Sequence, residues 1–286
     1  MVQTPFDATR LVVIENFFIP QLNSHRTVRI YLPQGYQCET SLRYPVLYMH
    51  DGQNMIDPAL SYGGQTWRAP EILDQLQRDG QSNGILLVCV DNNTDYEGAR
   101  MDEYSPWPCE KMVHLGTREH ANNHKGGKGA QYINFIVETL KPYIDAHYRT
   151  LADRDHTVIA GSSMGGHISL YALLQHSETF HFAGVFSPAF WFSENAMAAF
   201  IEQAQCPYPV GIYMDMGTRE SSNHDIGHFP QVYLNGARRM QRLLEQKDAS
   251  IALRYDEIAL AVHNEAAWAE RFPAFLCDAF RLQSSC

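Results

Sequence analysis

The chain has 286 residues, of which 45% are apolar and 19% are charged, and its formal net charge is −10. This apolar content excludes a disordered chain, and a chain of this length can bury a sizeable core. Because the charge is negative and no basic cluster is present, nucleic acid and anionic membranes are excluded as the expected main partners.

The first third of the chain is predicted to contain strands and one helix. Strands are predicted at residues 11–20, 26–33, 44–52 and 84–93, and a helical pattern covers residues 67–78. The first two strands follow each other closely, which indicates an antiparallel pair. Segment 84–93 is largely apolar, as is typical of a strand covered on both faces.

A long polar segment, at about residues 94–128, interrupts this pattern. A loop of this length in a compact domain is usually functional. We therefore expect one domain, residues 1–286, with a loop insertion here. The segment holds Trp107 and three histidines, His114, His120 and His124. Because no carboxylate pattern accompanies the histidines, we expect a solvated or substrate-contacting loop and no metal.

Strands and helices alternate through the rest of the chain. The predicted strands are residues 156–163, 181–188, 211–217 and 251–258, and the predicted helices are residues 131–148, 163–177, 232–246 and 265–280. Such alternation indicates an α/β fold with a mostly parallel central sheet and helices on both faces.

The strongest chemical signal is a G-x-S-x-G motif, Gly161 to Gly165, between a predicted strand and a predicted helix. A serine on such a sharp turn presents its hydroxyl above the sheet, and the glycines are needed because the turn leaves no room for side chains. The next residue, Met164, lies at the start of the predicted helix, so its N–H can bind an oxyanion. Ser163 is therefore the candidate nucleophile.

A serine hydroxyl needs a histidine as its base, and in folds with this turn the acid and the histidine follow the serine in the chain. His263 lies between the last predicted strand and the last predicted helix, and it is the candidate base. His167 and His176 lie on the helix that follows Ser163 and should point away. His224 and His228 remain rivals.

The triad acid is expected on the loop after predicted strand 211–217. Glu220 lies just past that strand and is the favoured residue. Asp215 lies inside the strand pattern, where a structural role is expected, and Asp225 is a further alternative.

Two other features concern the substrate. The turn after predicted strand 44–52 can supply a second oxyanion N–H near Gln53, although an ordinary Asp-Gly turn would give the same sequence. Trp107, Phe190 and Trp191 are candidate walls of the substrate pocket, and core packing is the alternative for each of them.

Several segments together resemble the putative-esterase family of α/β-hydrolases, over roughly residues 25–280. The segments are YPVLYMHDGQNMID, RMDEYSPW, GSSMGG, VFSPAFWF, MGTRE and VHNEAAW. The family includes esterase D, feruloyl and acetyl-xylan esterases, enterochelin esterases and mycolyltransferases. The resemblance implies an α/β-hydrolase fold with Ser163 as nucleophile, His263 as base, Glu220 as acid and the amides of Gln53 and Met164 as the oxyanion hole.

The location is expected to be cytoplasmic. The N-terminal residues MVQTPFDATR lack the basic and apolar regions of a secretory signal, and the longest apolar run, ILLVCV, is far too short to cross a membrane. No two of the six cysteines form a C-x-x-C pair, so neither a zinc knuckle nor a redox dithiol is indicated.

The sequence thus predicts a serine esterase without a cofactor, acting on a small acyl or carbohydrate-type ester. Three alternatives stay open: acyl transfer to a sugar or other alcohol, a non-catalytic binding protein on the same fold, and a metal-dependent hydrolase that uses the histidine clusters. The oligomeric state is not predicted.

Overall fold

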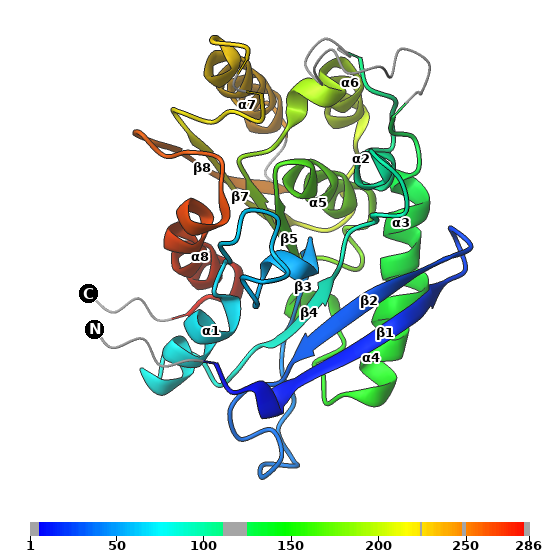
Figure 1. Ribbon diagram of the computed structural model, residues 1–286, viewed down its shortest axis with the longest axis vertical. Coiled ribbons are helices and arrows are strands. Elements are labelled where there is room, and N and C mark those ends of the chain that lie inside the picture. The colour runs from blue at the N-terminus through cyan, green and yellow to red at the C-terminus, as the bar shows by residue number, and fades with distance from the viewer. Residues whose placement is uncertain (1–5, 111–124, 224, 248–249, 283–286) are drawn as a thin grey trace.

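An eight-stranded sheet organises the chain (Figure 1). A computed structural model describes residues 6–110, 125–223, 225–247 and 250–282. The strands are β1 (Leu11–Ile19), β2 (Ser24–Tyr31), β3 (Val46–His50), β4 (Leu86–Val90), β5 (Thr157–Ser162), β6 (Phe182–Phe186), β7 (Val210–Gly217) and β8 (Ile251–Ile258). Their order in the sheet is β1-β2-β4-β3-β5-β6-β7-β8.

Among the described strands, β2 alone runs opposite to the rest of the sheet. It pairs antiparallel with both β1 and β4, and every other pair is parallel. The predicted antiparallel start and the mostly parallel sheet are therefore confirmed.

The helices are α1 (Ala69–Arg78), α2 (Ala99–Glu103), α3 (Gly129–Phe135), α4 (Lys141–His147), α5 (Met164–Gln175), α6 (Glu194–Gln203), α7 (Phe229–Glu245) and α8 (Glu265–Phe280). Short 3-10 turns include η2 (Gly52–Asn54) and η6 (Phe190–Phe192). In the described part of the chain, no helix has the length and hydropathy needed to span a membrane.

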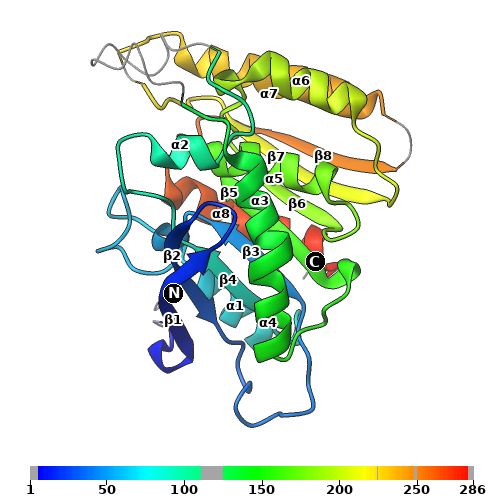
Figure 2. The same ribbon diagram turned by 90° about the vertical axis from the view of Figure 1, so that its right-hand side faces the viewer.

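The helices cover both faces of the sheet because side chains alternate along each strand. In β3, Tyr48 belongs to the apolar core shared with α3 to α7, whereas Leu47 and Met49 belong to the core shared with α1 and α8. Figure 2 shows the column formed by α3 and α4 in front of the sheet. Strands that are buried on both faces account for the continuous apolar runs in the sequence.

Two predicted segments differ in detail. The helix predicted at 131–148 is interrupted by a π-helical segment, Ile136–Leu140, just before Pro142, which cannot donate a backbone hydrogen bond. The segment expected as a loop at about 94–128 contains α2, so it is not loop throughout. A helix of five residues is too short to produce a periodic pattern.

The carboxyl ends of the parallel strands share one edge of the sheet. The turn after β3 carries Gln53, the turn after β5 carries Ser163, the loop after β7 carries Glu220 and the segment after β8 carries His263. Open α/β sheets bind their ligands at this edge. The architecture is the α/β-hydrolase fold, as the sequence predicted.

Candidate active site

Ser163 sits in a strained turn between β5 and α5. Its φ and ψ are 59° and −121°, a conformation that side chains rarely adopt, and its N–H donates to Phe186 O at 2.9 Å. A Cβ on Gly161 would lie 2.9 Å from the carbonyl carbon of Gly165. The two glycines of the motif are therefore required because their backbones touch across the turn.

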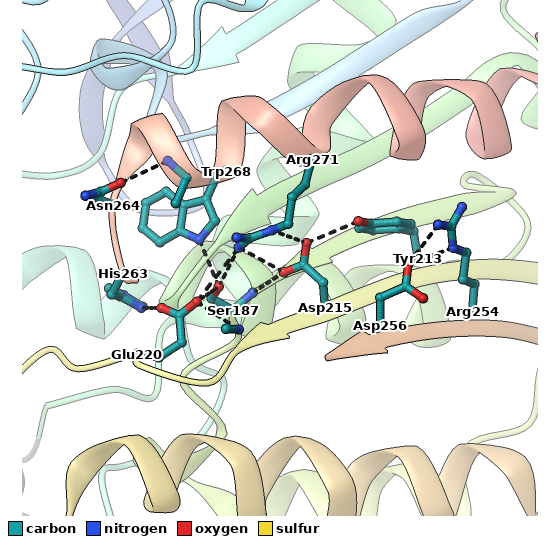
Figure 3. A network of polar contacts seen from close by, with 12 residues as sticks. Ser187, Tyr213, Asp215, Glu220, Arg254, Asp256, His263, Asn264, Trp268 and Arg271 are labelled. Carbon is teal, nitrogen blue, oxygen red and sulfur yellow. Dashed lines mark hydrogen bonds and ion pairs between the residues drawn. The ribbon is translucent and has the colours of Figure 1, made fainter. Parts of the chain in front are cut away.

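His263 and Glu220 form a direct pair (Figure 3). His263 Nδ1 lies 2.7 Å from Glu220 Oε2. The Glu220 side chain is fully buried. Although burial alone would raise the pKa of Glu220, the hydrogen bond and charge of His263, together with the Ser187 hydroxyl, hold that pKa below its usual range.

Tyr233 of α7 packs against His263. Its ring centroid lies 5.0 Å from that of His263, and its hydroxyl donates to Ser222 Oγ at 3.0 Å. Burial raises the pKa of Tyr233, and its hydrogen bond with Ser222, together with the nearby Trp191 and Ser163 side chains, acts against that rise. Within the described residues no direct hydrogen bond joins Ser163 to His263, and such bonds are often long before substrate binds.

The alternative acids lie elsewhere. Asp215 is inside β7, fully buried and paired with Arg271, whose Nε lies 2.7 Å from Asp215 Oδ2. Asp225 is exposed, and its N–H donates to the Asn223 side chain. Of the three candidates, only Glu220 is paired with His263.

The turn after β3 is fixed by Asp51, which has a φ of 55°. Arg100 of α2 donates to both carboxylate oxygens of Asp51, at 2.6 and 2.7 Å. A Cβ on Gly165 would lie 3.3 Å from Asp51 Oδ2, so this turn touches the start of α5. Gln53 is in η2 and Met164 begins α5, and the first N–H groups of a helix have no acceptor inside it.

Of the three candidate pocket aromatics, Trp191 packs beside Tyr233, and Trp107 and Phe190 have other neighbours. The Trp107 ring packs against Tyr171 of α5 and Phe200 of α6, with centroids 5.7 and 5.5 Å away. Phe190 is 1% exposed and packs near His167. Trp191 is 4% exposed, and its ring centroid lies 6.4 Å from that of Tyr233, which itself packs against His263.

Two of the other candidate histidines lie within the described residues and take no part in the pair with Glu220. His167 is fully buried, and desolvation lowers its pKa to about 3. His228 directly precedes α7. The other candidates lie outside the described residues: His114, His120, His124 and His224. Among described residues, no group of three or more histidine, cysteine, aspartate or glutamate side chains is arranged to hold a metal ion.

Tyr233, Ser187 and Arg271 are among the residues near the candidate triad that were not predicted from the sequence. Tyr233 is part of a helical pattern, Ser187 follows a strand and Arg271 is one of several charged residues of α8. Only the fold brings them to Glu220 and His263. The VFSP segment around Ser187 is the one sequence signal, because it contributed to the family resemblance.

Comparisons with known proteins relate this chain to esterases. A family model described as "Putative esterase" matches residues 19–279. An uncharacterised protein of Bacillus subtilis, YbbA, is 24% identical over 196 residues, covering 68% of this chain and 69% of that protein. An endo-1,4-beta-xylanase/feruloyl esterase of Xylanibacter ruminicola is 25% identical over 183 residues, which are 63% of this chain and 22% of that protein.

A solved structure shows the same fold. A ferulic acid esterase of Anaeromyces mucronatus, in complex with ferulic acid, superimposes with a TM-score of 0.65 at 21% identity. The match covers 98% of this chain and 93% of that one.

Proposed function

Because the chain belongs to the putative-esterase family and is a carboxylic ester hydrolase, we propose that it works through a serine triad of Ser163, His263 and Glu220. The observation that carries this proposal is the 2.7 Å contact between His263 Nδ1 and Glu220 Oε2, at the same sheet edge as the Ser163 turn. A carboxylate on Nδ1 leaves Nε2 as the base, which is the tautomer the reaction needs.

The proposed reaction has two halves. Ser163 Oγ attacks the ester carbonyl carbon while His263 Nε2 takes the hydroxyl proton, and the same imidazole then protonates the leaving alcohol. Water attacks the resulting acyl-enzyme by the same route and releases the acid. The Gln53 and Met164 amides are proposed to stabilise each oxyanion, a contribution of about 3 kcal/mol per donor in related chemistry.

The proposed substrate is a small acyl or carbohydrate-type ester. Support comes from the feruloyl esterase of Xylanibacter ruminicola, whose name states an ester of that class. Trp191 is the proposed pocket wall, because its ring lies beside Tyr233. A cytoplasmic location is part of the proposal, since Cys38, Cys89 and Cys277 form no disulfide bond and reducing compartments keep thiols free.

A substrate panel tests the proposal. We expect the purified protein to hydrolyse at least one of p-nitrophenyl acyl esters, feruloyl esters and acetylated sugars, and Ser163→Ala to lose nearly all of that activity while it keeps its melting temperature. Wild-type turnover by a folded Ser163→Ala would refute the serine mechanism. Added alcohol acceptors should not divert the acyl group; if they consume the acyl-enzyme, acyl transfer is the function instead.

The metal-dependent alternative has its own test. Acyl transfer by a triad needs no Lewis acid, so hydrolysis should survive EDTA. A loss that zinc restores would assign the activity to the histidine clusters.

A further inference from the structure

Ser187 lies between two buried carboxylates (Figure 3). It follows the end of β6, is fully buried and has a φ of 41°. Its N–H lies 3.1 Å from the carbonyl oxygen of Asp215 and 3.2 Å from Asp215 Oδ1. The backbone contact with β7 therefore fixes Ser187 beside the loop that carries Glu220.

The hydroxyl of Ser187 has three polar neighbours. Trp268 Nε1 lies 2.8 Å from Ser187 Oγ, Arg271 Nη2 lies 3.1 Å from it, and Glu220 Oε1 lies 2.6 Å from it. An indole N–H and a guanidinium can only donate. Because a hydroxyl has two lone pairs and one proton, both lone pairs are taken, and the proton must point to Glu220.

This arrangement determines what Glu220 can do. Its Oε1 accepts from the Ser187 hydroxyl and from the Gly217 N–H, the latter at 3.0 Å. With both of these neighbours donating, Oε1 has no acceptor for a proton of its own, so the ionised carboxylate is the favoured form. The remaining oxygen, Oε2, then accepts from His263 Nδ1.

The charge of Arg271 is balanced on its other side. Its Nε lies 2.7 Å from Asp215 Oδ2, while its Nη2 is 3.8 Å from Glu220 Oε1. Tyr213 also donates to Asp215 Oδ2, at 3.2 Å. The Arg271 guanidinium can therefore donate to Ser187 while the Asp215 carboxylate neutralises its charge.

We propose that Ser187 is a positioning residue of the esterase reaction: Trp268 and Arg271 orient its hydroxyl, which donates to Glu220 and so fixes the His263 tautomer. This inference rests on the proposed serine mechanism. It assigns to the buried Asp215 and Arg271 side chains a role in orienting the triad acid through Ser187, in addition to their contribution to packing.

The test compares Ser187→Ala with Tyr213→Phe, which deletes a buried hydroxyl from the Asp215 end of the same network. The pH dependence of kcat/KM is measured between about pH 5 and about pH 9, together with kcat and the melting temperature. Without the Ser187 donor the Glu220 carboxylate loses one of the hydrogen bonds that hold its pKa down, so it binds protons more tightly. We expect the acidic limb of Ser187→Ala to rise by about 0.5 to 1 pH unit and kcat to fall about tenfold.

Tyr213→Phe should lower the melting temperature and leave the acidic limb unchanged. An acidic limb that stays at the wild-type position in Ser187→Ala, or that moves equally in both variants, would overturn the inference. If Ser187→Ala does not fold, Trp268→Phe removes one of the two donors to Ser187 and keeps an aromatic ring there. The acidic limb of the Trp268→Phe profile should move to higher pH by less than that of Ser187→Ala. An acidic limb at the wild-type pH in Trp268→Phe would overturn the inference as well.

Ser163→Ala is assayed in parallel to separate the two proposals. If Ser163→Ala retains turnover, the serine mechanism itself is wrong. If Ser163→Ala is inactive while the limb of Ser187→Ala matches the wild type, only the role of Ser187 is refuted.

Discussion

Glu220 and Asp215 are both fully buried carboxylates, and their partners give them different tasks. Glu220 is paired with His263, the candidate base, whereas Asp215 is paired with the guanidinium of Arg271. Burial raises the pKa of Asp215 to about 6, and the Arg271 charge opposes that rise. A carboxylate held this way balances a buried cation, and it can affect Glu220 only through Arg271 and Ser187.

We predict that Glu220→Gln lowers kcat by at least about 10²-fold with little change in melting temperature, since the amide favours the wrong imidazole tautomer. Asp215→Asn should instead cost about 3 kcal/mol or more of stability, because Arg271 then lacks its counter-charge, and should affect kcat less. Steady-state kinetics and thermal melts of both variants check this, with the exposed Asp225→Asn as the control. A folded but inactive Asp215→Asn beside an active Glu220→Gln would reassign the acid.

The sequence predicted the residues that motif and chain order specify, and missed those that only packing brings in. Ser163 was indicated by its flanking glycines, and His263 and Glu220 by their order after it. Ser187 and Tyr233 carry no such pattern, because each acts through a contact with an element distant in the chain. Local spacing holds no information about such contacts.

The end of β7 packs closely against the proposed triad acid, Glu220. A Cβ on Gly217 would lie 2.5 Å from Glu220 Oε1 and would also overlap the carbonyl oxygen of Ala261, two residues before His263. Any side chain at residue 217 must therefore displace the acid or the segment that carries the base.

We predict that Gly217→Ala lowers kcat by about 10²-fold through this displacement. Gly227→Ala, on the same connection between β7 and α7, is the matched control, since a Cβ there would have nothing within 4 Å. Kinetics of the two variants on one ester decide the point. Equal activities would show that the close approach at Gly217 is not needed for catalysis.

The strands with long apolar runs and the longer helices were predictable, because the spacing of their apolar residues in the local sequence indicates which side chains are buried. The short helix α2 was not, since its stability comes from distant partners: Arg100 binds Asp51, and Asp102 accepts the N–H of Gly126. Interactions across the fold, rather than local propensity, decide such segments.

Buried neutral histidines connect the stability of the whole molecule to pH. Desolvation lowers the pKa of His167 and of His50 to about 3 in the folded state. The unfolded chain takes up protons on these rings below about pH 6.5, while the folded protein does not. Each histidine therefore lowers the free energy of unfolding as the pH falls from about 6.5 towards 3.

His167 Nε2 lies 3.2 Å from Ser193 Oγ, a contact that a glutamine amide can also make. We predict that His167→Gln weakens this dependence. Between about pH 6 and about pH 4, its stability relative to the wild type should rise by about 1.4 kcal/mol per pH unit of acidification. Urea denaturation of both proteins at each pH measures this difference. A constant difference across that range would mean that His167 is protonated in the folded state. The comparison with the wild type cancels the opposite contribution of Asp215, whose raised pKa adds stability as the pH falls.

Labelling with a fluorophosphonate, followed by peptide mapping, shows directly whether Ser163 is the nucleophile of this ester hydrolase. We expect to find the label on the peptide that contains Ser163, labelling to abolish hydrolysis, and folded Ser163→Ala to be neither labelled nor active. A label on another residue with Ser163 unmodified, or an unlabelled wild-type protein that still hydrolyses esters, would contradict this assignment of the nucleophile.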